Sequence, residues 1–306
     1  MTTFQEYLAD LKDEGRPLKA TKLLHLSHLV DEEERAFLDA WPEIGIERRR
    51  QMVRQLGELA EDNVELNFDA IFLACLSDAD PEVRAVAIRG LWEYEQRDLI
   101  ERLIGLLQSD DSAFVRAEAA LALGRFVLQC EFGSLPDRYF RQVEQALRRT
   151  IDDEGQELEV RGRALEAIGA CSLPWVREAI DRAYRSDNQR LRVSGIHAMG
   201  RNCDPSWLPI LFEELKSEDP EMRYEAALAC GLLAEEAAVL HLAPLLEDED
   251  IEVREVTIAA LGEIGGRQAR AVLLRYLEGP SQGMREAVEE ALSVVDFTED
   301  PLSFSP

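Results

Sequence analysis

A short pattern centred on an arginine recurs eight times along this chain, and this recurrence restricts the available folds more than any other feature. In most copies an aliphatic residue precedes the arginine, a small residue follows at three positions, an apolar residue at seven and a glycine at eight. The last five anchors are each 31 residues apart, a fixed period typical of stacked copies of one structural unit. The eight anchors are Arg49, Arg84, Arg116, Arg161, Arg192, Arg223, Arg254 and Arg285.

Each copy of the pattern predicts an amphipathic helix. The positions one before the anchor and three, six, seven and ten after it are apolar or small, so they share one helical face. Pro81 and Pro220 stand where a first helical turn tolerates proline. Short polar residues that can cap a helix lie four positions before six anchors, namely Asp80, Ser112, Asn188, Asp219, Asp250 and Ser281.

A further amphipathic segment precedes these helices, so the repeated unit is a helix, an acidic turn and a second helix. Two helices cannot bury their apolar faces alone, and neighbouring pairs are therefore expected to stack into one continuous core. The array of about eight units covers residues 45–295. Arg116 and Arg161 are 45 residues apart, which predicts a longer connection within residues 125–160. The extra residues are assigned to a longer loop and a lengthened first helix.

The two ends of the chain do not fit the pattern. Residues 1–44 predict three helices, over residues 4–11, 18–30 and 32–41. Their expected role is to cap the exposed face of the first repeat, and a docking module is the alternative. Residues 296–306 contain two prolines and no periodicity, which predicts a disordered tail.

The residues of the repeat resemble the HEAT family, in particular the short bacterial HEAT-like repeats that also occur in phycobilisome lyases. The stretches from Asp80 to Trp92 and from Asp250 to Gly262 match its Asp-x-x-Val-Arg-x-x-Ala-x-x-x-Leu-Gly motif most closely. The resemblance implies an all-α, right-handed α-solenoid of antiparallel helix pairs, with the second helices lining its concave surface. It also implies a hydrogen-bonded ladder of turn aspartates and anchor arginines, made by Asp80, Arg84, Arg116, Arg161, Arg192, Asp219, Arg223, Asp250 and Arg254.

Composition narrows the range of partners. With 34 Lys and Arg against 61 Asp and Glu, the formal net charge is −27. Nucleic acid and anionic membrane surfaces are therefore poor partners, because both attract basic proteins. No apolar run approaches the ~20 residues that cross a bilayer, and the first residues lack a secretory signal pattern. The five cysteines form no paired motif, which favours a reducing, cytoplasmic setting.

The sequence offers no converging set of catalytic, cofactor-binding or metal-binding residues. His25 and His28 share a helical face, but no carboxylate or cysteine accompanies them there, and two surface histidines are the simpler interpretation. Some HEAT-type proteins are iron hydroxylases that use His-Glu dipeptides, and no histidine in this chain precedes a glutamate. The acidic clusters lack the alternating pattern of a calcium loop and fit solvated turns at helix starts.

What remains is the variable surface of the second helices. This strip carries arginine and aromatic side chains that are common in binding hot spots. We therefore expect a non-catalytic scaffold or adaptor that binds an acidic or aromatic-bearing protein or peptide on the concave face. The alternatives are that Trp92 and Tyr224 pack between repeats, and that the chain is a bilin lyase-like enzyme or chromophore-binding protein. The candidate partner-binding residues are Arg89, Trp92, Arg125, Arg163, His197, Arg201 and Tyr224.

Overall fold

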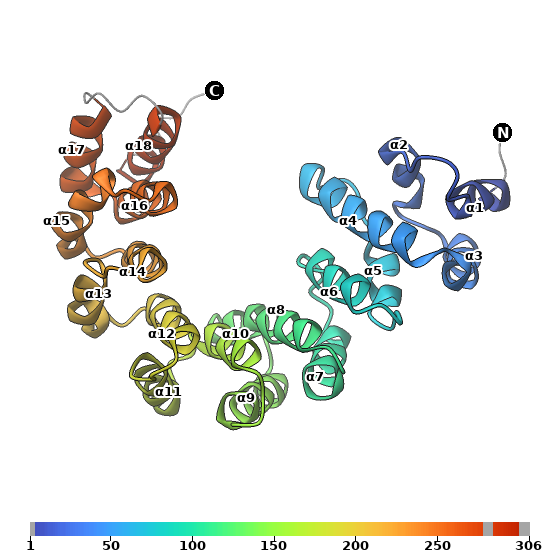
Figure 1. The fold of residues 1–306 in the computed structure, drawn as a ribbon, viewed down its shortest axis with the longest axis horizontal. Helices are drawn as coiled ribbons and strands as arrows, with labels where there is room; N and C mark the ends of the chain where they lie inside the picture. The colour runs from blue at the N-terminus through green and yellow to red at the C-terminus, as the bar shows by residue number, and fades with distance from the viewer. Residues whose placement is uncertain (1–3, 278–283, 300–306) are drawn as a thin grey trace. The chain divides into compact units, whose positions relative to one another are not determined.

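The computed structural model describes residues 4–277 and 284–299, and within these residues every regular element is a helix (Figure 1). The chain forms two compact units, residues 1–123 (unit 1) and 124–306 (unit 2), with the boundary inside one helix. The α-helices are α1 (Phe4–Lys12), α2 (Ala20–Leu23), α3 (Asp31–Ala40), α4 (Ile46–Asp62), α5 (Asp69–Cys75), α6 (Pro81–Gly90), α7 (Asp98–Ser109), α8 (Ala113–Glu131), α9 (Asp137–Asp152), α10 (Leu158–Ile168), α11 (Pro174–Tyr184), α12 (Gln189–Arg201), α13 (Leu208–Glu214), α14 (Pro220–Leu233), α15 (Val239–Leu242), α16 (Ile251–Ile264), α17 (Gly266–Leu277) and α18 (Arg285–Glu299).

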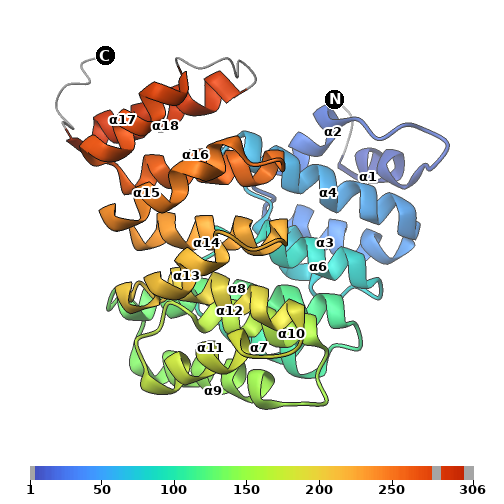
Figure 2. The same cartoon turned by 60° about the vertical axis from the view of Figure 1, so that its left-hand side comes forward.

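Unit 2 is a regular stack of helix pairs, as the repeat predicts. The second helices α10, α12, α14, α16 and α18 pack each against the next and form one layer. The first helices α9, α11, α13, α15 and α17 form the other layer (Figures 1 and 2). Three predicted caps are present in unit 2, since the side chains of Asn188, Asp219 and Asp250 accept hydrogen bonds from the first turns of α12, α14 and α16. The predicted cap Ser281 lies outside the described residues.

Small residues let successive second helices approach closely. A methyl group added at Gly200 of α12 would lie 2.6 Å from the Cα atom of Ala229 in α14, closer than side-chain carbons approach. The same pairing of glycine with an alanine in the next repeat recurs along the stack. Five of the periodic glycines thus allow this close packing, and the pairs are Gly124 with Ala167, Gly169 with Ala198, Gly200 with Ala229, Gly231 with Ala260 and Gly262 with Ala291.

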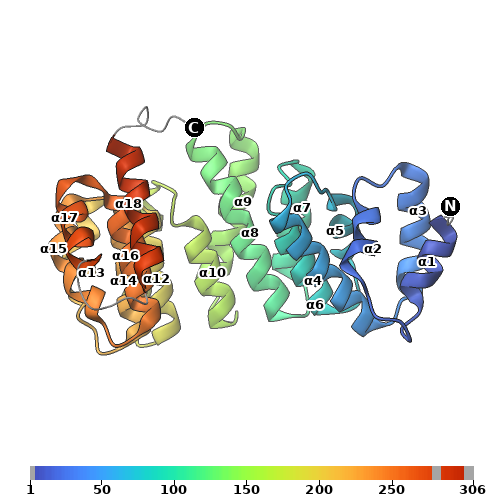
Figure 3. The same ribbon diagram turned by 90° about the horizontal axis from the view of Figure 1, so that it is seen from above.

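In unit 1, the N-terminal helices pack on the first repeat. Helix α2 contacts α4, and α3 contacts both α1 and α5, which Figure 3 shows at the N-terminal end of the chain. The predicted second helix, residues 18–30, is wrong in length, because α2 is followed by a 3-10 helix over Leu24–Leu26. The chain then turns at His28, which has a φ of 54° and donates its backbone N–H to the Asn67 carbonyl.

Two further elements differ from the sequence-based prediction. The extra residues of the long repeat extend α8 to Glu131 as well as lengthening α9, so the irregular loop between them is shorter than predicted. Helix α18 continues to Glu299, so residues 296–299 of the predicted tail are helical. The remaining tail residues, 300–306, lie outside the described part of the chain.

Candidate partner-binding face

The anchor arginines connect consecutive turns of the stack, but through a different aspartate from the one predicted. In unit 2, Arg223 donates two hydrogen bonds of 2.7 Å to the carboxylate of Asp248, in the turn before the next second helix. It also donates to the carbonyls of Ser217 and Glu218 in the turn before its own helix. In unit 1, Arg84 makes the same pattern with Asp110 and the carbonyls of Asp78 and Ala79.

The resemblance implied that Asp80, Asp219 and Asp250 would accept from the anchor arginines, and the structure uses all three as helix caps. Asp80 also binds Arg50 of the preceding repeat, at 3.0 and 2.6 Å, but Arg50 is not an anchor arginine. The acceptor for the anchor arginine stands two residues earlier. Asp248 binds the guanidinium of Arg223 and also stabilises the turn, because one of its oxygens accepts the backbone N–H of Asp250 at 2.9 Å. A carboxylate oriented by this turn geometry is already positioned for a bidentate arginine.

The other predicted ladder arginines have different acceptors, which are backbone carbonyls for three of them and a glutamate for Arg192. Arg116 donates to the Asp110 carbonyl at 2.6 Å, Arg161 to the Ile151 carbonyl at 3.1 Å and Arg254 to the Asp248 carbonyl at 2.6 Å. Arg192 reaches Glu214 at 3.4 Å. For Arg116, Arg161 and Arg192 the difference follows from the sequence, because the position equivalent to Asp248 in the next repeat is occupied by Gly155, Ser186 and Ser217, respectively.

A buried charge cluster joins α10 to α12. The side chain of Glu166 is 3% exposed and accepts hydrogen bonds from Arg163 (2.8 Å), Arg190 (3.0 Å) and Ser194 (2.7 Å). Burial alone would raise the pKa of Glu166, but the Ser194 hydrogen bond and the two guanidinium charges hold it below its ordinary value. Glu159 bridges the same two arginines from the outside. The cluster is therefore internally neutral.

Three predicted partner-binding residues lie around this cluster. Arg163 belongs to it, and His197 of the next repeat lies near Glu166. His197 itself pairs with Glu225 of α14 through a 3.0 Å contact from Nδ1. Arg201 lies one turn beyond His197 on α12, where burial lowers the pKa of its guanidinium. The Nε atom of Arg201 is buried and finds no acceptor among the described residues.

The remaining predicted residues have other surroundings. In unit 1, Trp92 is 53% exposed. Arg89 lies over the ring of Phe114 at 5.7 Å and contacts Glu118 at 3.4 Å. In unit 2, Tyr224 is half-buried, which raises the pKa of its hydroxyl, and Arg125 lies over the ring of Phe126.

Sequence reasoning did not select Glu166, Arg190, Ser194 or Leu232. A glutamate at a position facing the next repeat, followed 24 and 28 residues later by an arginine and a serine on the next second helix, is a signal that could have revealed the cluster. Leu232 on α14 is 46% exposed, and its Cδ1 atom lies 3.2 Å from a methyl group built at Gly200. It thus covers the residue adjacent to Arg201.

The residues that the structure describes show neither a metal-binding cluster nor a membrane-spanning helix. They contain no group of three or more His, Cys, Asp or Glu side chains placed to hold a metal ion. Within the same residues, no helix combines the length and apolar character needed to cross a membrane. The surface chemistry of this face is therefore that of arginine, histidine, carboxylates and a few exposed apolar side chains.

An all-helical chain in which capped helix pairs stack at a fixed period is an α-solenoid of short repeats. The family model for HEAT repeats matches residues 69–154, 173–246 and 208–293. The chain therefore belongs to the HEAT-repeat family.

Curated relatives and a solved structure show a similar pattern. The HEAT repeat-containing taxis protein OE_2401F of Halobacterium salinarum is 30% identical over 62% of this chain and 41% of its own length. The bilin biosynthesis protein PecE of Nostoc sp. is 38% identical over 28% of this chain and 35% of its own. Both matches thus leave more than half of the relative uncovered. The complex of CpcE and CpcF of phycocyanin lyase from Nostoc sp. superposes with a TM-score of 0.54 at 17% identity, covering 92% of this chain and 97% of that one, which shows a shared fold.

Proposed function

We propose that this chain is a non-catalytic interaction scaffold that holds a segment of a partner protein on the second-helix face of unit 2. In HEAT-type solenoids this is the concave face. The proposal rests chiefly on Arg201, a partly desolvated guanidinium whose Nε lacks an acceptor among the described residues. The Nε atom is closed off from solvent, so a partner's carboxylate is expected at the terminal nitrogens of this half-buried guanidinium, which forms no ion pair within the described residues.

The surroundings of Arg201 indicate the chemistry of the partner. Arg163 and Arg190 are neutralised by Glu159 and Glu166, so they offer little to an acidic ligand. Leu232, exposed beside Gly200, offers an apolar contact next to the guanidinium. The face therefore favours a peptide segment in which an acidic side chain is followed or preceded by an aliphatic or aromatic one.

A peptide-display selection on the purified full chain tests this proposal. We expect selected peptides to combine an acidic residue with an apolar neighbour, and their dissociation constants to rise at least tenfold in Arg201→Ala and about threefold in Leu232→Ala. The matched control is Arg185→Ala, because Arg185 lies on the first-helix side, is 73% exposed and pairs with Asp181. Equal affinity for Arg201→Ala and wild type, with both proteins folded by circular dichroism, would contradict the proposal.

A second candidate is a role in bilin chemistry, favoured by the 38% identity to PecE over 89 residues. The fold shared with the CpcE–CpcF complex is compatible with it. Addition of phycocyanobilin to the full chain should then shift the visible absorption of the pigment at a stoichiometric ratio. If the pigment has the same spectrum with this chain as with albumin, a control for nonspecific binding, the bilin role is contradicted. That result would not affect the scaffold proposal.

A further inference from the structure

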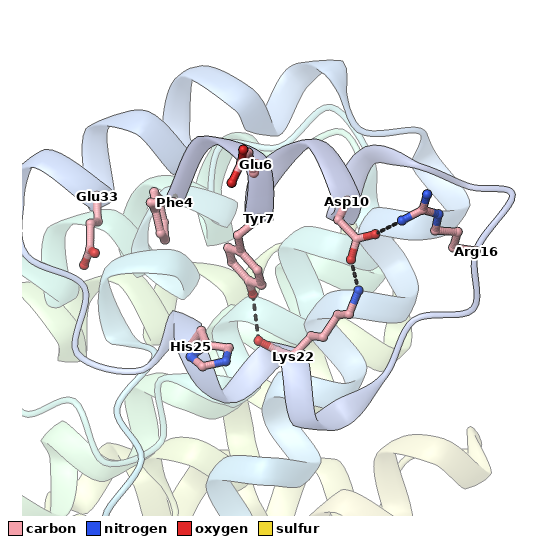
Figure 4. A pocket seen from close by; sticks show the side chains of 8 residues that line it. All are labelled: Phe4, Glu6, Tyr7, Asp10, Arg16, Lys22, His25 and Glu33. Carbon is pink, nitrogen blue, oxygen red and sulfur yellow. Dashed lines mark hydrogen bonds and ion pairs between the residues drawn. The ribbon is translucent and has the colours of Figure 1, made fainter. Parts of the chain in front are cut away.

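A pocket lies among the N-terminal helices of unit 1, whereas the proposed partner-binding face belongs to unit 2. Its volume is about 660 Å³, within the range that holds a small ligand or a short peptide segment. Figure 4 shows its lining, which comes from α1, α2, the 3-10 helix after α2, α3 and the loop after α1. The lining residues are Phe4, Glu6, Tyr7, Asp10, Arg16, Lys22, His25 and Glu33.

One end of this N-terminal pocket is occupied by an internal ion cluster. Asp10 pairs with both Arg16, at 2.7 Å, and Lys22. Arg16 also pairs with Asp13 at 3.0 Å. The two cations of the lining are therefore neutralised by carboxylates of the same segment, and this end offers no free positive charge to an anion.

The other end combines aromatic rings with a carboxylate. The ring of Tyr7 lies 5.7 Å from that of Phe4 and 5.8 Å from that of His25. The Tyr7 hydroxyl donates to the Lys22 carbonyl at 2.8 Å, which fixes the ring in place. Figure 4 shows Glu33 beside Phe4 at this end, and among the described residues Glu33 has no ion-pair partner.

From this arrangement we infer that the N-terminal pocket binds an organic cation, either the side chain of an arginine or lysine in a partner or a small free guanidinium or ammonium compound. Aromatic faces attract such cations, and a nearby carboxylate supplies the counter-charge. The net charge of −27 raises the local concentration of basic ligands around the chain. The N-terminal helices then serve as a docking module in addition to covering the first repeat.

Fluorescence anisotropy of a labelled Gly-Gly-Arg-Gly peptide with the full chain tests the inference. Its control peptide replaces arginine by citrulline, which has nearly the same shape and no charge. We expect at least tenfold tighter binding of the arginine peptide, a fivefold or larger loss in Glu33→Gln, and a threefold loss in Phe4→Leu. The matched protein control is Glu61→Gln, which removes an exposed carboxylate from α4, outside the pocket lining.

The results distinguish a free cation from a partner's side chain. They also test the N-terminal pocket separately from the proposed scaffold function. Competition by ethylguanidine at the same concentration as unlabelled peptide indicates a free cation, whereas competition by the peptide alone indicates a partner's side chain. Equal losses in Glu33→Gln and Glu61→Gln, or no preference for arginine over citrulline, overturn the inference. Arg201→Ala should not change the result, so this pocket and the second-helix face of unit 2 are tested independently.

Discussion

Two neighbouring parts of unit 2 use the same helical frame but place their charges differently. Between α10 and α12, the charges lie on the helix faces, where Glu166 binds Arg163 and Arg190. Between α14 and α16, they lie at the turn, where Arg223 binds Asp248. Both pairs nevertheless have the same close glycine–alanine approach between their second helices. The repeat thus fixes the spacing of the helices, and residues outside the repeat pattern decide how each pair is linked.

A few substitutions account for the difference. Gly162 on α10 admits Ser194, since a methyl group at Gly162 would lie 2.5 Å from the Ser194 hydroxyl. The equivalents of Glu166 and Ser194 in the α14–α16 pair are Leu228 and Val256, which cannot hold a guanidinium. A buried ion cluster contributes less to stability than its contacts suggest, because the charges lose their hydration. Glu166 neutralises Arg163 and Arg190 on this face, whereas Arg201 forms no ion pair with the described residues.

Among the substitutions that test this comparison, removal of Glu166 should change the free energy of unfolding most. In Glu166→Ala, two arginines and Ser194 lose their shared acceptor, and we expect a loss of about 3 to 4 kcal/mol in the free energy of unfolding, within the range for breaking a buried pair. Urea denaturation followed by circular dichroism measures it. Glu290→Ala is the matched control, because Glu290 holds the equivalent position on α18 but is exposed. Equal midpoints for the two variants would show that the cluster does not stabilise the α10–α12 contact.

The spacing shared by both pairs is tested at Gly200. A methyl group there meets the backbone of Ala229, so α12 and α14 must separate, and Gly200→Ala should cost close to 3 kcal/mol, the upper end for overpacking. Gly57 occupies the same position in the first repeat, and a methyl group there meets nothing within 4 Å. Gly57→Ala should therefore stabilise α4 by about 0.5 to 1 kcal/mol, as expected for removal of a helical glycine. Thermal unfolding of both variants decides the point, and a destabilised Gly57→Ala would contradict it.

The turn linkage is tested by Arg223→Ala. The buried carboxylate of Asp248 then loses its bidentate partner, and we expect a loss of about 2 kcal/mol at neutral pH. Burial raises the pKa of Asp248, but the Arg223 hydrogen bond and the Asp250 backbone N–H hold it below its ordinary value. Because the pKa of Asp248 is lower in the folded state, its ion pair with Arg223 stabilises the fold fully at any pH above the pKa of an unfolded aspartate. This stabilisation is lost as the pH falls through the lowered pKa of the folded state. The difference between the variant and wild type should therefore be constant above about pH 5 and shrink below about pH 4.

Much of the fold could be predicted from sequence because it depends on local, periodic information. The 31-residue spacing, the capping residues and the glycines specify helix pairs and their close packing, and the structure has them where predicted. The N-terminal second helix was not predictable in this way. It ends early because the backbone at His28 turns and binds Asn67, a contact between distant parts of the chain that no local pattern indicates.

The candidate site was less predictable for the same reason. The sequence indicates which helix face carries Arg163, His197 and Arg201, but not which of them already have partners. Arg163 binds two glutamates of its own helix, and Arg201 binds none. That Arg190 of the next repeat shares the same two glutamates depends on how successive repeats pack. The choice between Asp248 and Asp250 as the partner of Arg223 likewise depends on turn geometry, because both are aspartates at nearly equal separation in the sequence.

The smallest expected effect comes from moving the turn linkage into a repeat that lacks it. Ser217 holds the position of Asp248 in the preceding repeat, and its hydroxyl already accepts the Asp219 backbone N–H at 3.3 Å. Ser217→Asp keeps that turn and gives Arg192 a carboxylate in place of its 3.4 Å contact with Glu214. Because Arg192 is 41% exposed, the gain should be about 0.5 kcal/mol, as for other exposed ion pairs. In the double variant Ser217→Asp with Arg192→Ala the gain should vanish, and a gain that persists there would show that the introduced carboxylate acts through the turn alone.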